Sequence, residues 1–261
     1  MANFLIYPFK TMWISQNYNA NGNPNNSHWW YSHGNPADYP LDERGADYGR
    51  DWFYCPCDEM EIVKIYGVGN TRQTNTIWMT STSKVIFADL TTDYATIMCI
   101  HPNDDDLKKL KVGQKFKRFD KIFREGTDGH ATGNHIHFEV GKGKMKGGGW
   151  AENNKGKWLL TTTDGAMKPE KAMAVDKSFT TIKEKQGLKF KSLRMVKQGL
   201  KYKVDCDTLN CREKPSTDAK IIKTLKKGKK FRVYLIEIHD GYKWGQCKSG
   251  CWVALKYCLK I

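Results

Sequence analysis

Gly133-Asn-His-Ile-His-Phe-Glu-Val140, near the middle of the chain, alternates polar and apolar side chains from His135 onward. In a β-strand, alternate residues lie on the same face of the sheet. His135, His137 and Glu139 are therefore expected on one face, with the apolar residues between them pointing into a core. Two neighbouring imidazoles on an open sheet face suit a metal ligand beside an acid or base. This stretch predicts a β-strand that carries a functional site.

Strand patterns also dominate the sequence before this stretch. Short alternating or apolar runs that end at turn residues are typical of strands. Such runs occupy Glu61–Tyr66, Thr76–Thr80, Val85–Asp89 and Tyr94–His101. Only Asp104–Lys111 favours a helix, and that stretch is short. We therefore expect an all-β, antiparallel domain over residues 1–160.

Short strand patterns return after residue 196, beyond a polar and poorly periodic stretch. They occupy Lys201–Val204, Ile221–Leu225, Lys230–Ile238, Tyr242–Gln246 and Gly250–Ala254. Closely spaced short strands with tight turns predict a small β-barrel. The expected organisation is a domain at 1–160, a connector at 161–195 and a barrel at 196–261.

The charge follows the same division. The chain of 261 residues has a formal net charge of +15, of which +1 falls in residues 1–160 and +14 in residues 161–261. A strongly basic segment suggests a polyanionic partner, although a solvated lysine-rich surface explains it equally well. Nucleic acid and a wall polymer rich in phosphate or carboxylate are the two candidate partners at this point.

Composition and the N-terminus limit where the protein acts. Hydrophobic residues make up 39% and aromatic residues 12% of the chain, which argues against a disordered protein. No apolar run is long enough to span a membrane. The first residues, Met1-Ala-Asn-Phe-Leu-Ile-Tyr-Pro8, lack the features of a secretory signal, so we expect synthesis in the cytoplasm without a signal peptide.

The eight cysteines are divided unevenly. Three lie in the first part of the chain and five lie after residue 205. Because both numbers are odd, neither set pairs completely within its own domain. The spacings in the second set also miss the close pairs of a zinc ribbon. We expect mostly buried or reduced thiols.

Other histidines and carboxylates extend the candidate site. His101 ends a long apolar strand, and His28 and His33 precede the carboxylates Asp42 and Asp47. A catalytic zinc ion takes three protein ligands and keeps one position open for water. His33, Asp42 and His137 would supply two imidazoles and one carboxylate. Zinc then lowers the pKa of its bound water to about 7, which produces a nucleophile at neutral pH.

A larger stretch around these histidines resembles a known family. Gly126-Thr-Asp-Gly-His-Ala-Thr-Gly-Asn-His-Ile-His-Phe-Glu139 is similar to the glycine turn and final His-x-His strand of lysostaphin/LytM-type zinc endopeptidases, which cut peptidoglycan peptides. Lys111-Val-Gly-Gln114 and Tyr54-Cys-Pro-Cys-Asp58 match two turns of that family. The resemblance extends from Thr11 to Trp158, and it implies a zinc peptidase fold.

The resemblance also implies residue roles. It makes His137 a zinc ligand, and it makes His135 and His101 catalytic residues beside the scissile carbonyl. The family usually has a His-x-x-x-Asp pair for its first two ligands. The chain departs from this pattern, since that register places Glu43 with Asp47. We therefore expect His33 and Asp42 to be these ligands, with His28 and Asp47 as substitutes.

The C-terminal segment resembles a second family. Asp207-Thr-Leu-Asn-Cys-Arg-Glu-Lys-Pro-Ser-Thr217 is similar to the opening of bacterial Src-homology-3-like domains, and Tyr242–Gln246 and Gly250–Ala254 continue the pattern. In lysins these domains bind the cell wall. Residues 196–261 carry a net charge of +10, which favours anionic wall polymers over nucleic acid as the partner.

Together these features predict a phage endolysin: a zinc endopeptidase that cleaves bacterial peptidoglycan, followed by a wall-binding domain. Without a signal peptide, it would reach the host wall through a holin pore. One alternative is a Cys/His amidohydrolase that uses Cys55 or Cys57 with His101. The other is a catalytically degenerate wall-binding protein that has lost its metal.

Overall fold

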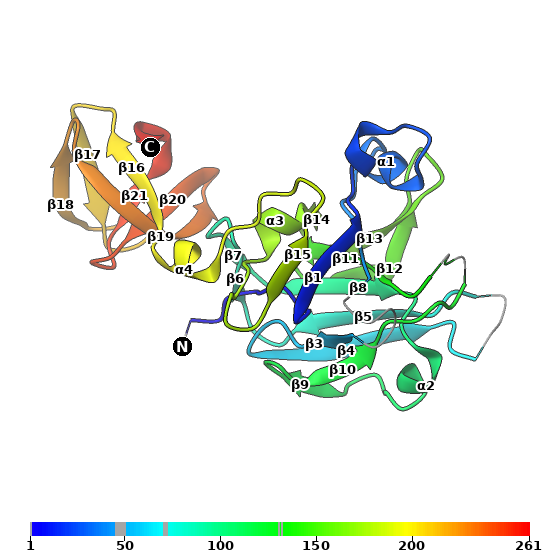
Figure 1. Ribbon diagram of the computed structural model, residues 1–261. Helices are drawn as coiled ribbons and strands as arrows, with labels where there is room; N and C mark the ends of the chain where they lie inside the picture. The colour runs from blue at the N-terminus through cyan, green and yellow to red at the C-terminus, as the bar shows by residue number, and fades with distance from the viewer. Residues whose placement is uncertain (1, 45–50, 70–72, 130, 132) are drawn as a thin grey trace.

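A computed structural model describes residues 2–44, 51–69, 73–129, 131 and 133–261 of the chain. The protein is built mainly from β-strands, which confirms the all-β prediction (Figure 1). Figure 1 shows a large sheet-containing unit formed by most of the chain and a smaller unit formed by the C-terminal residues. Among the described helices, none has the length and apolar character needed to cross a membrane.

A nine-stranded sheet organises the larger unit. Its order is β15-β1-β2-β11-β8-β5-β4-β9, and β14 pairs with β11 outside this path. Neighbours are antiparallel except β1 and β15, which are parallel. The strands are β1 (Thr11–Gln16), β2 (Leu41–Glu43), β4 (Glu59–Tyr66), β5 (Thr76–Ser81), β8 (Ala95–Ile100), β9 (Lys115–Lys117), β11 (Ile136–Lys142), β14 (Ala166–Met167) and β15 (Thr181–Glu184).

Short ribbons and helices surround this sheet. The two-stranded ribbons are β3 (Trp52–Tyr54) with β10 (Lys121–Arg124), β6 (Val85–Ile86) with β7 (Thr92–Asp93), and β12 (Met145–Glu152) with β13 (Trp158–Thr162). The helices are α1 (Ser27–Ser32), α2 (Asp104–Leu107), α3 (Pro169–Ala172), α4 (Leu193–Lys197) and the 3-10 turn η1 (Ala20–Gly22). The β12–β13 ribbon lies beside α1, where the Asn153 side chain donates to the Trp30 carbonyl at 3.4 Å.

The central strands are covered on both faces of the sheet. On one face, Phe138 of β11 packs with Tyr7 and Phe9 in the main core cluster. On the other face, Trp78 and Met98 form a second cluster under the β12–β13 ribbon. All six residues of β5 are buried, including the polar Thr76, Thr80 and Ser81, and the Thr80 hydroxyl is hydrogen-bonded to that of Thr96 at 2.9 Å.

The stretch predicted as a connector, residues 161–195, is part of the larger unit. Its strand β14 pairs with β11, and β15 pairs with β1. Met173 and Val175 are buried in the main core. The sequence is polar because β15 lies at the edge of the sheet with all four side chains exposed.

The smaller unit is an antiparallel seven-stranded sheet with the order β18-β17-β21-β20-β19-β16-β22. Among the described residues no pairing joins β18 to β22, so the small β unit is not closed by strand pairing. The sequence patterns missed β17 and β22. The strands are β16 (Leu200–Val204), β17 (Thr208–Arg212), β18 (Ile221–Lys226), β19 (Lys230–His239), β20 (Tyr242–Cys247), β21 (Trp252–Ala254) and β22 (Cys258–Lys260).

One disulfide is present beside the mostly buried or reduced thiols that the sequence predicts. Cys211 of β17 and Cys251, just before β21, are joined in the smaller unit. They are 40 residues apart in the sequence, and the antiparallel pairing of β17 with β21 brings them together. This pair was not predicted from the sequence, because five cysteines cannot all pair with one another within the unit. The other six cysteines are free.

Candidate metal and active site

Strand pairing brings the candidate residues together in one row across the sheet. His137 of β11 lies opposite Asp42 of β2 on one side and opposite Ile100 of β8 on the other. His101 directly follows Ile100, so it lies at the same end of the sheet. Residues 42, 101 and 137 therefore meet although long stretches of chain separate them.

Helix α1 supplies a third group to Asp42 and His137. The side chain of Asn26 caps this helix by accepting a hydrogen bond from the backbone N–H of His28 at 2.9 Å. His28 is on the buried side of the helix and only 2% exposed. Its Nε2 lies 3.2 Å from Asp42 Oδ1.

His33, the predicted ligand, lies elsewhere. It follows the last residue of α1, and its exposed ring stacks on Trp29 with the centroids 3.9 Å apart. His33 Nδ1 lies 2.9 Å from the Trp29 carbonyl oxygen. Since residues five apart point to different sides of a helix, His28 and His33 cannot both face the sheet. The structure therefore brings His28, not His33, to Asp42 and His137; Asp47 lies outside the described residues.

Three donor atoms converge in this group. His137 Nδ1 lies 2.9 Å from Asp42 Oδ1, and the ligand atoms of His28, Asp42 and His137 all lie within 4.8 Å of one another. The outer ring nitrogens have acceptors of their own. His28 Nδ1 lies 3.1 Å from the Asn17 carbonyl oxygen, and His137 Nε2 lies 3.3 Å from Glu139 Oε1. Metal-bound histidines commonly donate their second ring N–H to such carbonyls and carboxylates.

The electrostatics keep Asp42 ionised. Burial by itself would raise the pKa of Asp42, but the charge of His28 and the hydrogen bonds from His137 and His28 outweigh burial and lower the pKa well below its usual range. Asp42 is therefore a carboxylate at neutral pH. Without a metal these two imidazoles donate to Asp42; loss of the two inner protons on metal binding would leave lone pairs on His28 Nε2 and His137 Nδ1 beside the carboxylate.

A buried carboxyl pair lies behind His137. The backbone N–H of Leu160 donates to Asp38 Oδ2 at 2.9 Å and to Glu139 Oε2 at 2.7 Å. Burial and the neighbouring Glu139 raise the pKa of Asp38 well above its usual value. Asp38 can therefore hold a proton and donate it to Glu139. This arrangement leaves Glu139 an acceptor for the Nε2–H of His137.

Two more histidines border the donor group. The rings of His101 and His135 lie 4.7 Å apart, and His135 Nε2 lies 4.0 Å from Asp42 Oδ1. His101 Nδ1 lies 2.5 Å from the Asp128 carbonyl oxygen, and His135 Nδ1 lies 2.8 Å from the Gly133 carbonyl oxygen. In each ring these contacts favour a proton on Nδ1, which leaves Nε2 as a base.

His101 has two further features of a functional residue. Burial lowers its pKa to about 4, despite the hydrogen bond to the Asp128 carbonyl, so the ring is neutral at pH 7. Its φ of 69° lies in the left-handed region, where residues with a side chain are strained. Such strain is concentrated at functional sites.

These residues line an open pocket of about 640 Å³. His28, Asp42, His101, His135 and His137 are among the lining residues. The rest of the lining is mainly aromatic, apolar and hydroxyl-bearing: Ser27, Tyr31, Tyr66, Gln73, Thr74, Thr76, Met98, Ile100, Trp150, Lys157 and Trp158. A volume in this range is typical of sites for small ligands or segments of larger ones.

Tyr31 is a site residue that the sequence reasoning missed. Its ring lies 5.5 Å from that of His137, and burial together with the charges of Glu139, Asp38 and Asp42 raises the pKa of its hydroxyl. The hydroxyl is thus a donor at any physiological pH. The available signal was spacing, because Tyr31 is three residues after His28 and so lies on the same face of α1.

The cysteines of the amidohydrolase alternative do not reach this pocket. Cys55 and Cys57 are fully buried in the main core cluster. Cys55 Sγ lies 3.2 Å from the Phe116 carbonyl oxygen, and neither cysteine lines the pocket. No nucleophilic Cys–His pair with His101 is present among the described residues.

Comparison with known proteins gives a partial sequence match. No protein-family model matches the chain. Morphogenesis protein 1 of Bacillus phage B103 is 32% identical over 100 residues, which cover 38% of this chain. The match spans only a quarter of the length of that phage protein.

Solved structures give distant likenesses. The solution structure of lysostaphin aligns over 97% of this chain and 88% of its own, with 15% identity and a TM-score of 0.34. The antimicrobial peptidase lysostaphin from Staphylococcus simulans aligns over 83% and 79%, with 15% identity and a TM-score of 0.31. A zinc-containing peptidase from Vibrio cholerae aligns over 40% and 26%, with 21% identity and a TM-score of 0.26. Because all three TM-scores are below 0.5, these alignments do not indicate a function. The function has to be inferred from the residues of the chain itself.

Proposed function

We propose that this protein is a zinc-dependent endopeptidase that cleaves the peptides of bacterial peptidoglycan. The observation that carries the proposal is the group formed by His28, Asp42 and His137, whose ligand atoms converge at the edge of an open pocket. Three protein ligands with space for water are the usual arrangement of a catalytic zinc site. The substrate class rests on the resemblance of Gly126–Glu139 to lysostaphin/LytM-type enzymes.

The donor set fits zinc in particular. Zn–N and Zn–O bonds of about 2.0–2.1 Å in a tetrahedron put the ligand atoms about 3.3 Å apart. The 2.9 and 3.2 Å separations from Asp42 Oδ1 to His137 Nδ1 and His28 Nε2 are close to that value. The acceptors behind both imidazoles fix the tautomers that such binding requires. We therefore assign His28, Asp42 and His137 as the ligands.

The remaining residues have roles in the hydrolysis of a peptide bond. Zinc, when bound, supplies a water of lowered pKa and polarises a carbonyl. His101, neutral at pH 7, can accept a proton at Nε2, because its Nδ1–H is held by the Asp128 carbonyl. His135, whose Nε2 is also left as a base, can orient the attacking water or transfer its proton to the leaving amine. The Tyr31 hydroxyl can donate to the oxygen on which negative charge develops.

The C-terminal unit is proposed as the wall-binding part. Its Src-homology-3-like sequence pattern and its net charge of +10 support binding to peptidoglycan or to an anionic wall polymer. The partial match to a phage protein named Morphogenesis protein 1 supports a phage origin for this sequence. We thus retain the endolysin role as part of the proposal.

Metal removal tests the proposal directly. The purified protein should contain about one zinc per chain, and it should release new amino termini from purified muropeptides. Treatment with 1,10-phenanthroline should abolish this release, and added zinc should restore it, while circular dichroism stays unchanged. Alkylation by iodoacetamide should have no effect, since Cys55 and Cys57 are buried. Cleavage that survives the chelator would exclude a metallopeptidase.

A further inference from the structure

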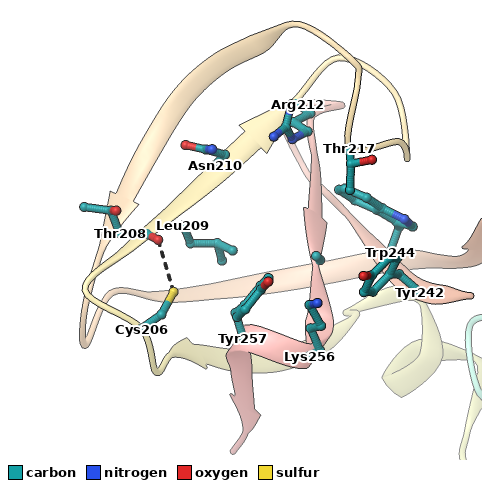
Figure 2. A pocket seen from close by; sticks show the side chains of 11 residues that line it. Cys206, Thr208, Leu209, Asn210, Arg212, Thr217, Tyr242, Trp244, Lys256 and Tyr257 are labelled. Atoms are coloured by element: carbon teal, nitrogen blue, oxygen red, sulfur yellow. Dashed lines mark hydrogen bonds between the residues drawn. The ribbon is translucent and has the colours of Figure 1, made fainter. Parts of the chain in front are cut away.

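The C-terminal unit contains a second pocket, of about 380 Å³. It lies between β17, β20 and the 3-10 turn η2 (Leu255–Tyr257). In Figure 2, Asn210 and Arg212 lie on one side of this space, Lys256 and Tyr257 on the opposite side, and Trp244 at one end. A volume of this size falls in the range of small-molecule sites. None of its lining residues belongs to the catalytic pocket.

The pocket has positive charge without a compensating acid. Arg212 and Lys256 line it, and no described carboxylate does. Arg212 Nη1 donates to the Ala219 carbonyl at 2.7 Å, which fixes the guanidinium while leaving other N–H groups for a ligand. Lys256 Nζ lies 4.0 Å from the ring centre of Tyr242 and 4.7 Å from that of Tyr257. Two positioned cations in a concave site attract an anionic group.

Trp244 is an aromatic wall at one end of the pocket. Its side chain lines the pocket and is only 2% exposed, yet its indole Nε1–H has no hydrogen-bond acceptor among the described residues. Buried donors in folded proteins almost always have a partner, and an unmet donor is costly. Because this nitrogen has almost no accessible surface, a bound molecule would pack against the indole ring and would not reach its N–H.

The uncharged lining indicates what kind of anion fits. Asn210 offers an amide, Thr208 and Thr217 offer hydroxyls, and Tyr242 and Tyr257 offer flat apolar walls. Amide and hydroxyl groups pair with peptide N–H and C=O groups, and aromatic walls pack against small side chains. A phosphate polymer would instead favour a continuous line of cations. The lining therefore suits a peptide with one negative end.

We propose that this pocket binds a short peptide by its terminal carboxylate, with Arg212 and Lys256 on the carboxylate, Asn210 on the adjoining peptide group and the Trp244 ring packed against the peptide. This inference rests on the proposed function, because stem peptides of peptidoglycan end in a free carboxylate. On this proposal the wall is recognised by a defined pocket that prefers the end of a peptide chain. Diffuse positive charge alone would give no such preference.

Nuclear magnetic resonance of the full-length, ¹⁵N-labelled protein tests this proposal. The probe is N-acetylated Lys-D-Ala-D-Ala, compared with the same tripeptide as its C-terminal amide. The indole N–H resonance of Trp244, assigned by its loss in Trp244→Phe, should shift and saturate with the acid. The amide should bind about tenfold more weakly, since one charge-assisted hydrogen bond is worth about that factor. Mass spectrometry of the recovered tripeptide checks that it stays intact.

Charge-matched variants separate the pocket from diffuse attraction. Lys256→Gln should weaken binding about tenfold, whereas Lys229→Gln, which removes the same charge from an exposed residue outside the pocket, should leave it unchanged. Equal effects of the two variants would overturn the proposal. So would a Trp244 shift caused by glycerol 3-phosphate but not by the tripeptide, since it would indicate a phosphate-polymer site. If the tripeptide does not bind while muropeptides are still cleaved, this inference is wrong and the proposed function still stands.

Discussion

Replacing His28 by alanine should remove zinc and activity together. Structural zinc sites with four protein ligands bind with about 10–16 kcal/mol, or roughly 2.5–4 kcal/mol for each ligand. Loss of the His28 imidazole, whose Nε2 lies 3.2 Å from Asp42 Oδ1, should therefore weaken zinc affinity by about 10²–10³-fold. His33→Ala is the matched control, because it removes an imidazole that stacks on Trp29 at the exposed end of the same helix. The His33→Ala substitution should lower the unfolding free energy by at most about 1 kcal/mol.

Both variants can be measured in the same way. Zinc is titrated into metal-free protein against a fluorescent chelator, and the zinc content after dialysis is read by mass spectrometry. Thermal unfolding shows whether each variant is folded. The reasoning is refuted if His33→Ala loses zinc while His28→Ala keeps it. Equal retention by both variants would mean that Asp42 and His137 hold the ion with a ligand outside the described residues.

Two further predictions concern chemistry and stability. His101→Ala and His135→Ala should keep zinc but lose about 10²–10⁴-fold in kcat on muropeptides, the usual worth of a general acid or base; zinc loss in either variant would make that residue a ligand. Reducing the Cys211–Cys251 bond, which spans 40 residues, should lower the unfolding free energy of the C-terminal unit by about 4 kcal/mol. Denaturant titration with and without reductant measures this change, and Cys211→Ser should unfold equally under both conditions.

The central strands were predictable from sequence because packing on the core leaves a pattern in them. The run at 94–101 matches β8, and the alternation at 133–140 matches β11 except that the strand begins at Ile136. β15 left no such pattern, because every side chain in it is exposed and its contribution is backbone pairing with β1. A polar edge strand therefore has the same sequence signature as a connector.

The site was predictable only as far as it lies on strands. Asp42 and His137 are brought together by strand register, and the sequence indicated both. The choice between His28 and His33 depends on where α1 begins, which the Asn26 cap decides. Two histidines that flank a cluster of aromatic residues look alike in sequence, and only the first turn of the helix directs one of them to the sheet. Tyr31 was missed for the same reason.

The contact between the two units has a consequence for how both pockets would be used. The backbone N–H of Ile236 in β19 donates to the Leu90 carbonyl at 2.7 Å, and Phe4 and Ala174 of the larger unit share a core cluster with Val233 of the smaller one. Residues 161–195 are bound into the first sheet, so they do not act as the flexible linker that would let a wall-binding domain search freely. A peptide held in the C-terminal pocket would therefore anchor the catalytic pocket at a fixed distance and orientation. On these two proposals, only those peptide bonds of the wall that lie at that distance from an anchored chain end would be presented to His101 and His135, and the docking of the two units would contribute to bond specificity.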